Sequence, residues 1–541
     1  MNRMGIGRTK TGLCLAFLAG FPWSTVPAQS NSGGSDPADY SRAENLVRNH
    51  QWDESLELIQ HLLAHDPHNL RALNLAGIAY GGEGDSQRAD QYFEACLKVN
   101  SHFLPALKNL SIDEFNQRQY VPAEKHLLMA DQQLPNDPTI NLYLAEIAYR
   151  QEKFKLAAQR FDRAKDIVAH NPNLTAHFGV SLFRSDQKQR ATEVTATITP
   201  PDIDPQSALA MGISLVQSDL SAQAVPYLQA AFAHDPASYD TGYDLAVAAI
   251  QAKEFGTAIA TAKDLIRQGH DTSELQNIFA EASAATGETN SAIEAYKKAI
   301  KLDPQDENNY LDFTSLCIDH RAFEDGMKVI TLGLQIHPKS ERMMFMRGVL
   351  QASQNEMELA EKDFQEASLL APQQSLGVVG LGSIYLERGH SEEAVRVIRA
   401  RLRQKPEDAS LLYLLGENLM RSGALPGQPA YSQAQAALEK SVKLNPRLCL
   451  PHISLGSIYM EEARYADAAV QFEQARAIDP TEKSSYSHLA VAYRRLGQPE
   501  KASEALTALK QVLAQGRVGG QVKTQIPAER SPGFDSKSAV P

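Results

Sequence analysis

Apolar residues recur along this chain in steps of three and four, the spacing of one face of a helix. In the stretch 452–480, small apolar residues recur beside large ones at this spacing. They lie on two such faces, which are joined by a short turn. In chain order these residues are Leu455, Gly456, Tyr459, Ala468, Phe472, Ala475 and Pro480. The pattern predicts two amphipathic helices packed against each other.

The same order returns along the chain with a period of 34 residues. Prolines mark the period most clearly. They stand at Pro67, Pro135, Pro236, Pro304, Pro338, Pro372, Pro406, Pro446 and Pro480. The longer step between Pro406 and Pro446 contains an insertion around 423–429. A period kept over this distance indicates a repeated structural unit.

Small residues recur at equivalent positions of the two predicted helices in each unit. These predicted packing residues include Gly77, Ala89, Gly212, Ala224, Gly382 and Ala394. A small side chain lets two helix backbones approach closely, while large neighbours fill the space beside the contact. We therefore expect Gly456 to lie against Ala468. The Asp-Pro and Asn-Pro pairs are expected to end one helix and to help start the next.

The order Leu-Gly-x-x-Tyr, then Ala, Phe, Ala and Pro, resembles the tetratricopeptide repeat. The resemblance covers about 36–514 and corresponds to about fourteen units. It implies an all-α fold, a right-handed α-solenoid of helix-turn-helix repeats.

The repeat pattern weakens between 183 and 205, where β-branched residues and prolines replace a clean second helix. One interpretation is a degenerate repeat and bend that separates an N-terminal array (36–182) from a C-terminal array (206–515). The alternative is a single irregular repeat that packs normally. Residues 516–541 lack apolar periodicity and are expected to form a disordered tail.

The N-terminus has the pattern of an export signal. Basic residues precede the apolar run TGLCLAFLAGF, and Val26-Pro27-Ala28 supplies small residues for cleavage near Ala28. We expect a signal peptide (1–28), a flexible segment (29–35), and a periplasmic or secreted protein. Lipidation at Cys14 is the alternative, although the apolar run follows this cysteine instead of preceding it. We expect no transmembrane segment after the signal peptide.

Charge and motifs limit the function. The net charge is -12, and it is -15 without the first 28 residues. This argues against nucleic acid as a partner, because phosphate binding needs a concentrated basic surface. The widely spaced Cys96, Cys317 and Cys449 form no metal or disulfide pattern. We found no motif of a metal site, a phosphate loop or a nucleophile, and therefore expect no cofactor, no metal and no enzyme.

The first helix of each repeat lines the concave face in such a solenoid, and its exposed positions here are mostly apolar. The predicted partner groove consists of Leu209, Ile213, Tyr243, Val247, Ile250, Leu311, Ile318, Phe345, Val349, Val379, Leu386, Ile453 and Met460. These side chains either line a groove for a peptide or an amphipathic helix, or pack against the neighbouring repeat.

The sequence therefore predicts a non-enzymatic scaffold or adaptor that binds other proteins through peptide or helical segments. The alternative is a structural accessory subunit of a bacterial envelope export or assembly machine. Stable co-purification of a partner with membranes would favour the machine, whereas transient soluble partners would favour the adaptor.

Overall fold

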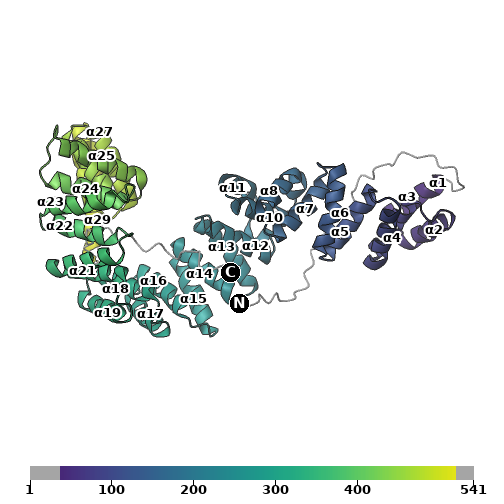
Figure 1. Cartoon of the computed structure of the whole chain (residues 1–541), viewed down its shortest axis with the longest axis horizontal. Coiled ribbons are helices and arrows are strands. Elements are labelled where there is room, and N and C mark those ends of the chain that lie inside the picture. Colours follow the sequence, from purple (N-terminus) through teal and green to yellow (C-terminus); the bar gives the residue numbers. More distant parts are fainter. Residues whose placement is uncertain (1–36, 519–541) are drawn as a thin grey trace. The chain divides into compact units, whose positions relative to one another are not determined.

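The structure is a computed structural model that describes residues 37–518 (Figure 1). Regular structure in this range is helical, without a strand, which confirms the predicted all-α solenoid of helix pairs. The predicted signal peptide (1–28) and flexible segment (29–35) lie outside the described residues. The first three residues of the predicted tail (516–541) belong to the last helix, α29 (Pro499–Val518). The rest of the tail lies outside the described residues.

The chain divides into two compact units, Met1–Ala248 (unit 1) and Ala249–Pro541 (unit 2). The division falls within α14 (Tyr239–Gln251). Residues 183–205 lie inside unit 1, so a bend at this place stays a prediction.

Unit 1 consists of consecutive helix pairs. Its elements before α14 are α1 (Pro37–Arg48), α2 (Trp52–His65), α3 (Leu70–Glu83), α4 (Ser86–Val99), α5 (Leu104–Asn116), α6 (Tyr120–Gln133), α7 (Pro138–Arg150), α8 (Phe154–Arg163), α9 (Lys165–Val168), α10 (Pro172–Phe183), α11 (Lys188–Thr195), the 3-10 turn η1 (Pro200–Asp202), α12 (Pro205–Val216) and α13 (Ser221–His234). In the weak stretch of the pattern, a second helix of eight residues, α11, replaces the usual longer one. Helix α10 packs against both α11 and α12, so the stack continues through this repeat.

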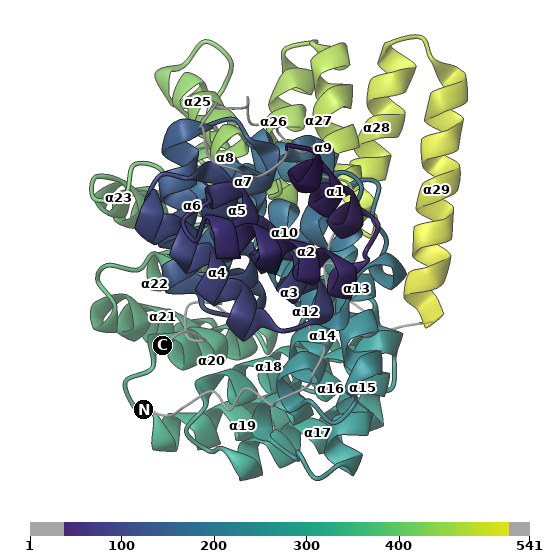
Figure 2. The ribbon, with the colours of Figure 1, turned by 90° about the vertical axis from the view of Figure 1, so that its right-hand side faces the viewer.

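Unit 2 continues the same arrangement. Its elements after α14 are α15 (Phe255–Arg267), α16 (Ser273–Ala285), α17 (Thr289–Leu302), α18 (Glu307–Asp319), α19 (Phe323–Ile336), α20 (Glu341–Ser353), α21 (Met357–Leu370), α22 (Leu376–Glu387), α23 (Ser391–Leu402), α24 (Ala409–Arg421), α25 (Pro429–Leu444), α26 (Cys449–Glu461), α27 (Tyr465–Ile478), α28 (Lys483–Arg495) and α29. In the last pair, α29 runs beside α28 and is the longer of the two helices, so that it extends beyond α28 (Figure 2).

A turn joins the two helices of each pair, and a residue just after the first helix has left-handed backbone geometry; the longer α24–α25 turn has a second one, Gly427. These fourteen residues, with φ between 57° and 88°, are His50, Gly84, Arg118, Glu152, Asp186, Asp219, Lys253, Gly287, Arg321, Asn355, Gly389, Gly423, Ala463 and Gly497. The amide of the next residue commonly bonds a carbonyl five residues back, as Asp85 N does to Tyr80 O at 2.9 Å. This is the Schellman pattern of a helix end. Fourteen such turns match the number of units expected from the resemblance.

Glycines of first helices make room for large side chains of second helices. A Cβ atom on Gly456 would lie 2.5 Å from the Phe472 ring, and one on Gly77 would lie 2.4 Å from the Phe93 ring. The side chain nearest to Gly456 is that of Phe472, and the expected contact between Gly456 and Ala468 stays a prediction. The predicted packing residues are buried, apart from Pro480. They are Gly77, Ala89, Gly212, Ala224, Gly382, Ala394, Leu455, Gly456, Tyr459, Ala468, Phe472 and Ala475.

The prolines that mark the period lie in the turns between pairs. Pro480 is exposed and stands between Asp479, the C-cap of α27, and Glu482, the N-cap of α28. Its carbonyl accepts a hydrogen bond from Tyr486 Oη at 2.8 Å. The expectation that this proline belongs to the helix packing is corrected: it marks the turn, and the residue two positions later caps the next helix.

Candidate functional site

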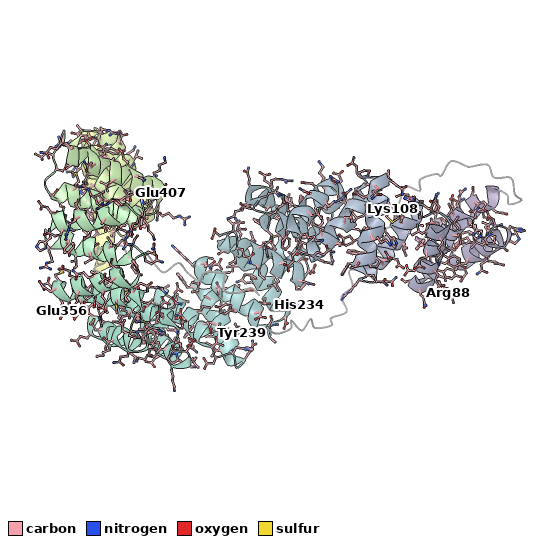
Figure 3. All side chains as sticks on the ribbon, in the orientation of Figure 1. Arg88, Lys108, His234, Tyr239, Glu356 and Glu407 are labelled. Atoms are coloured by element: carbon pink, nitrogen blue, oxygen red, sulfur yellow. The ribbon has the colours of Figure 1, made fainter. Side chains whose placement is uncertain are left out.

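Unit 2 contains a partly enclosed cavity of about 280 Å³, here called the unit 2 cavity. It lies at the C-terminal halves of the first helices α18, α20 and α22, along α24, and at the starts of α19 and α21. Its lining consists of Ile318, Arg321, Phe323, Ala352, Ser353, Met357, Ser383, Ile384, Leu386, Glu387, Tyr413, Leu414, Glu417 and Arg421. Figure 3 labels Glu356, which directly precedes Met357 of this lining.

The 34-residue period explains how the sequence builds this cavity. Ile318, Ala352 and Leu386 occupy the same position in three successive repeats. Phe323 and Met357 are likewise equivalent, since each is the first residue of a second helix. Equivalent residues of stacked repeats form rows. The small Ala352 between two large aliphatic residues leaves part of the space open.

The charged groups of the cavity lining balance each other. The lining contains two positive groups, those of Arg321 and Arg421, and two negative groups, those of Glu387 and Glu417. Arg421 Nε lies 3.7 Å from Glu417 Oε1, and Ser454 Oγ donates to Glu417 Oε2 at 2.6 Å. The lining therefore carries no net formal charge, and a neutral ligand group fits it better than an ion.

Tyr413, a residue of the cavity lining, has a protonated phenol. Burial, and then the charge of Glu417, raises the pKa of Tyr413 above its ordinary value. Its hydroxyl therefore stays protonated at neutral pH and can donate a hydrogen bond. A phenol with this shift is poorly suited to act as a base near pH 7.

Ser383 contributes a buried hydroxyl that lacks a partner. Its residue is 7% exposed, and Oγ makes no hydrogen bond with any of the residues that the structure describes. The equivalent serine two repeats later, Ser457, donates to the carbonyl of Ile453 at 3.0 Å. A buried hydroxyl without a partner is costly, but the Ser383 oxygen has almost no accessible surface and offers no contact to a ligand in the cavity.

The structure separates the predicted groove residues into three groups. Leu311, Phe345, Val349 and Val379 are only 4–7% exposed and belong to one apolar core of unit 2. Ile318 and Leu386 are half-buried and come together in the unit 2 cavity. The others lie outside this cavity and are half-buried, namely Leu209, Ile213, Tyr243, Val247, Ile250, Ile453 and Met460. At the four core positions the structure supports packing against neighbouring repeats.

Unit 1 contains a buried polar network that the sequence analysis missed. Glu146 Oε1 lies 2.7 Å from His177 Nδ1, and His177 Nε2 lies 3.0 Å from Ser207 Oγ. This is the order of groups in a serine hydrolase triad. Ser207, however, is 1% exposed, and its hydroxyl donates to Asp204 Oδ2 at 2.8 Å. No substrate reaches this oxygen, so the network links the first helices α7, α10 and α12.

The carboxylate of Glu146 is strongly stabilised in its ionised form. Its burial by itself would raise its pKa, but the charge and hydrogen bond of His177, together with those of Arg150, lower the pKa of Glu146 to about 2. Glu146 and His177 lie about one repeat apart in the sequence, and Glu146 and Arg150 lie four residues apart on one helix. This spacing was the signal available in the sequence.

Other candidate chemistry in residues 37–518 is limited. Burial raises the pKa of Cys96 to about 12, and burial together with Asp325 raises the pKa of Cys317 to about 11, so both thiols stay protonated. No group of three or more His, Cys, Asp or Glu residues in this range is placed to hold a metal ion. No helix in the same range combines the length and the apolar character that a membrane crossing needs.

Protein-family models of the tetratricopeptide repeat match residues 70–103, 215–281, 273–306, 379–441 and 459–520. The matches fall in both units and keep the period of the helix pairs. The chain therefore contains tetratricopeptide repeats in both units. Proteins of this family bind other proteins and are generally interaction scaffolds without enzymatic activity.

Among curated proteins, this tetratricopeptide repeat chain is similar to the TPR repeat-containing protein YpiA of Bacillus subtilis (strain 168). The two are 23% identical over 285 residues, which covers 51% of this chain and 66% of YpiA, slightly under two thirds of its length.

Two solved structures share part of this arrangement at low identity. Yeast Tom70 is 14% identical with a TM-score of 0.41, and the match covers 89% of this chain and 96% of Tom70. A tetratricopeptide repeat protein from Parabacteroides merdae is 16% identical with a TM-score of 0.36, and the match covers 53% of this chain and 98% of that one.

Proposed function

We propose that this chain is a non-enzymatic scaffold that binds a peptide or helical segment of another protein at the unit 2 cavity. The observation that carries the proposal is the cavity itself. Half-buried aliphatic residues from repeats along the stack, Ile318 and Leu386, line one partly enclosed space together with charged groups such as Arg321 and Glu417. Protein-binding sites commonly combine an apolar centre with a few polar groups that fix orientation.

The location of the cavity differs from that of the groove expected from the sequence. The N-terminal halves of the first helices α20 and α22 are closed by core packing, since Phe345 and Val379 are buried. A bound segment would therefore lie across the C-terminal ends of the first helices, over Leu386 and Met357. The apolar contacts of such a segment supply affinity, and the charged rim orients it.

A peptide-display selection on the purified chain tests this proposal. The wild-type chain should enrich a family of related peptides, and Leu386→Asp should lose their binding by tenfold or more, since a charge replaces a half-buried apolar contact. Leu369→Asp is the matched control, because Leu369 is 79% exposed on the second helix α21.

Equal loss of binding in the two variants, or enrichment that neither variant changes, would contradict a site in the unit 2 cavity. Retained helix content in Leu386→Asp, measured by circular dichroism, shows that lost binding does not come from unfolding.

We also propose that the chain is exported and acts in the periplasm or outside the cell. The support is the N-terminal pattern of basic residues, apolar run and small residues before Gln29. N-terminal sequencing of the protein isolated from its host should find Gln29 as the first residue. A protein that starts at Met1 would contradict export by this signal.

A further inference from the structure

We propose that an open hollow in unit 1, here called the unit 1 hollow, binds an acidic segment of another protein. This site is separate from the unit 2 cavity, and the chemistry of its ligand is different. The hollow has a volume of about 610 Å³ and lies where the turn before α8, the start of α8 and the end of α10 meet. Helices α7, α8 and α10 pack against one another at this place (Figure 1).

The lining of the unit 1 hollow has an excess of positive charge. It contains three exposed basic residues, Lys153, Lys155 and Arg184, and one acidic residue, Glu152, which leaves a formal charge of +2. The first turn of α8, which belongs to the lining, contains no acidic residue. The whole chain, in contrast, has a net charge of -12. A local positive surface of this kind attracts a ligand with negative charge.

The three cations of the lining are available to a ligand, because none of them pairs with a carboxylate of the residues that the structure describes. A basic residue further along the chain, Arg190, is already paired, with Asp162 at 2.6 Å. The guanidinium of Arg184 lies over the ring of Phe154, with Cζ 4.7 Å from the ring centroid. The ring supports this cation without using its N–H groups, which can therefore donate charge-assisted hydrogen bonds to a carboxylate.

Apolar surface lies among these cations. Leu156 is 40% exposed and lines the hollow together with the half-buried Phe154. This mixture fits a segment in which an apolar side chain stands between acidic ones. The apolar side chain would contact Leu156, and the carboxylates would meet the lysines and Arg184.

The charge of the whole chain favours a short acidic segment over a larger anionic partner. Nucleic acid or an anionic membrane would bring many negative charges close to an acidic chain, whereas a short segment meets only the hollow. Tetratricopeptide repeat proteins bind other proteins, which agrees with a protein segment. The sequence after residue 518 contains three basic and two acidic residues, so this part of the chain does not match the hollow in charge.

The experiment measures the binding of three rhodamine-labelled, C-terminally amidated peptides to the full chain by fluorescence anisotropy. The probes are Glu-Asp-Leu-Glu-Asp, its amide counterpart Gln-Asn-Leu-Gln-Asn, and Glu-Asp-Gly-Glu-Asp, which lacks the apolar side chain. We expect a dissociation constant of about 0.1 mM for the first peptide, about tenfold weaker binding of the second and about threefold weaker binding of the third. Raising the salt concentration from about 0.05 M to about 0.5 M should weaken the first peptide about tenfold.

Variants place this binding in the unit 1 hollow. Lys155→Glu should weaken Glu-Asp-Leu-Glu-Asp by about tenfold or more, because a like charge replaces an opposite one. Leu156→Gln should weaken the same peptide about threefold and leave Glu-Asp-Gly-Glu-Asp unchanged, since that peptide has no side chain for the contact.

Two controls exclude other causes. Lys301→Glu makes the same change of charge at an exposed lysine of α17 in unit 2 and should keep the wild-type affinity. Leu386→Asp in the unit 2 cavity should also keep it, which separates the two sites. Circular dichroism of each variant should match that of the wild type, because the substituted side chains of the hollow lie at the surface.

Equal affinities for the acidic peptide and its amide counterpart, or wild-type affinity in Lys155→Glu, would overturn the inference. An equal loss in Lys301→Glu would overturn it as well, because the effect would then come from the net charge. Vesicles of phosphatidylglycerol and phosphatidylcholine that bind the wild type but not Lys155→Glu would assign the hollow to a membrane and not to a protein segment. A dimer that Lys155→Glu dissociates, seen by analytical ultracentrifugation, would assign it to a second copy of this chain.

Discussion

Glycines in the first helices set how closely the two helices of a pair approach. Gly77 and Phe93, Gly348 and Phe364, and Gly456 and Phe472 repeat one contact, in which the ring of the later residue occupies the space of a missing Cβ atom. The glycine therefore serves packing against a neighbour, and it weakens the helix by its own conformational freedom. The contact is favourable because a buried aromatic ring contributes more than the helix loses.

Gly456→Ala should destabilise unit 2 by roughly 1–3 kcal/mol, since its Cβ atom would lie 2.5 Å from a Phe472 ring atom. Gly256→Ala is the matched control, because this helical glycine has open space around its Cβ position. The control should be neutral or stabilising by about 0.5–1 kcal/mol. Urea unfolding followed by circular dichroism distinguishes the two, and equal effects would contradict the close contact.

Asp113 in unit 1 is a second residue that can be tested by itself. Its burial, and then the hydrogen bond and charge of Asp90, raises the pKa of Asp113 to about 6, although Ser86 and Gln117 donate hydrogen bonds to it. A carboxyl whose pKa is raised by folding binds its proton more tightly in the folded state. Stability is therefore lost as the pH rises from the ordinary pKa of 3.8 through about 6.

Asp113→Asn should remove this loss and stabilise unit 1 at pH 7 by about 1 kcal/mol, after allowance for solvent screening. The measurement is the thermal midpoint of wild type and variant between about pH 4 and pH 7. Glu94→Gln, an exposed acid on the same helix as Asp90, is the control and should keep the wild-type dependence. A variant with the wild-type pH profile would show that Asp113 is not the titrating group.

In each helix pair, the chain reverses its direction in a connecting turn that contains a residue with left-handed backbone geometry. Five of the fourteen positions are glycines, namely Gly84, Gly287, Gly389, Gly423 and Gly497, and the other nine carry side chains. A residue with a side chain pays a steric cost in this conformation, which glycine avoids. The turn is thus fixed by the Schellman bonds and by packing of both helices, and not by glycine alone.

Ala463→Gly should stabilise the α26–α27 pair by about 0.5–1 kcal/mol, because Ala463 has φ 58° without the side-chain hydrogen bonding that Asn or Asp offers there. Gly497→Ala, at the equivalent turn with φ 69°, should destabilise the α28–α29 pair by a similar amount. Hydrogen exchange of the amides in each pair gives the local change. The same sign in both variants would contradict left-handed geometry at these turns.

The period of 34 residues predicted the helix pairs well, since helix faces and small residues are dictated by local packing. It did not single out Phe472 as the side chain nearest to Gly456, because Phe472 lies sixteen positions later and only the crossing of the two helices selects it among the large neighbours. Likewise, no pattern distinguishes Ser383 from Ser457, since their difference lies in the hydrogen bonds that their surroundings allow.

The larger apolar core of unit 2 extends from α18 to α29, with members from Tyr310 to Ala505. Each repeat from α18 onward contributes to it through contacts with its neighbours, as expected for stacked helix pairs. The apolar face of the first helices was predicted as a groove or as packing. The sequence could not decide between them, because burial of Phe345 and Val379 depends on how tightly successive pairs coil. Part of this face opens into the unit 2 cavity around Leu386.

Hydrogen exchange of the wild-type chain, Phe345→Asp and Leu386→Asp tests this division between core and binding surface. Phe345→Asp should expose amides of α20 and α22 to rapid exchange, since it replaces a buried ring by an unpaired charge at a cost of roughly 4 kcal/mol or more. Leu386→Asp should keep wild-type protection in these helices. Wild-type protection in Phe345→Asp would contradict the account, because it would place Phe345 on an open groove and not in the core.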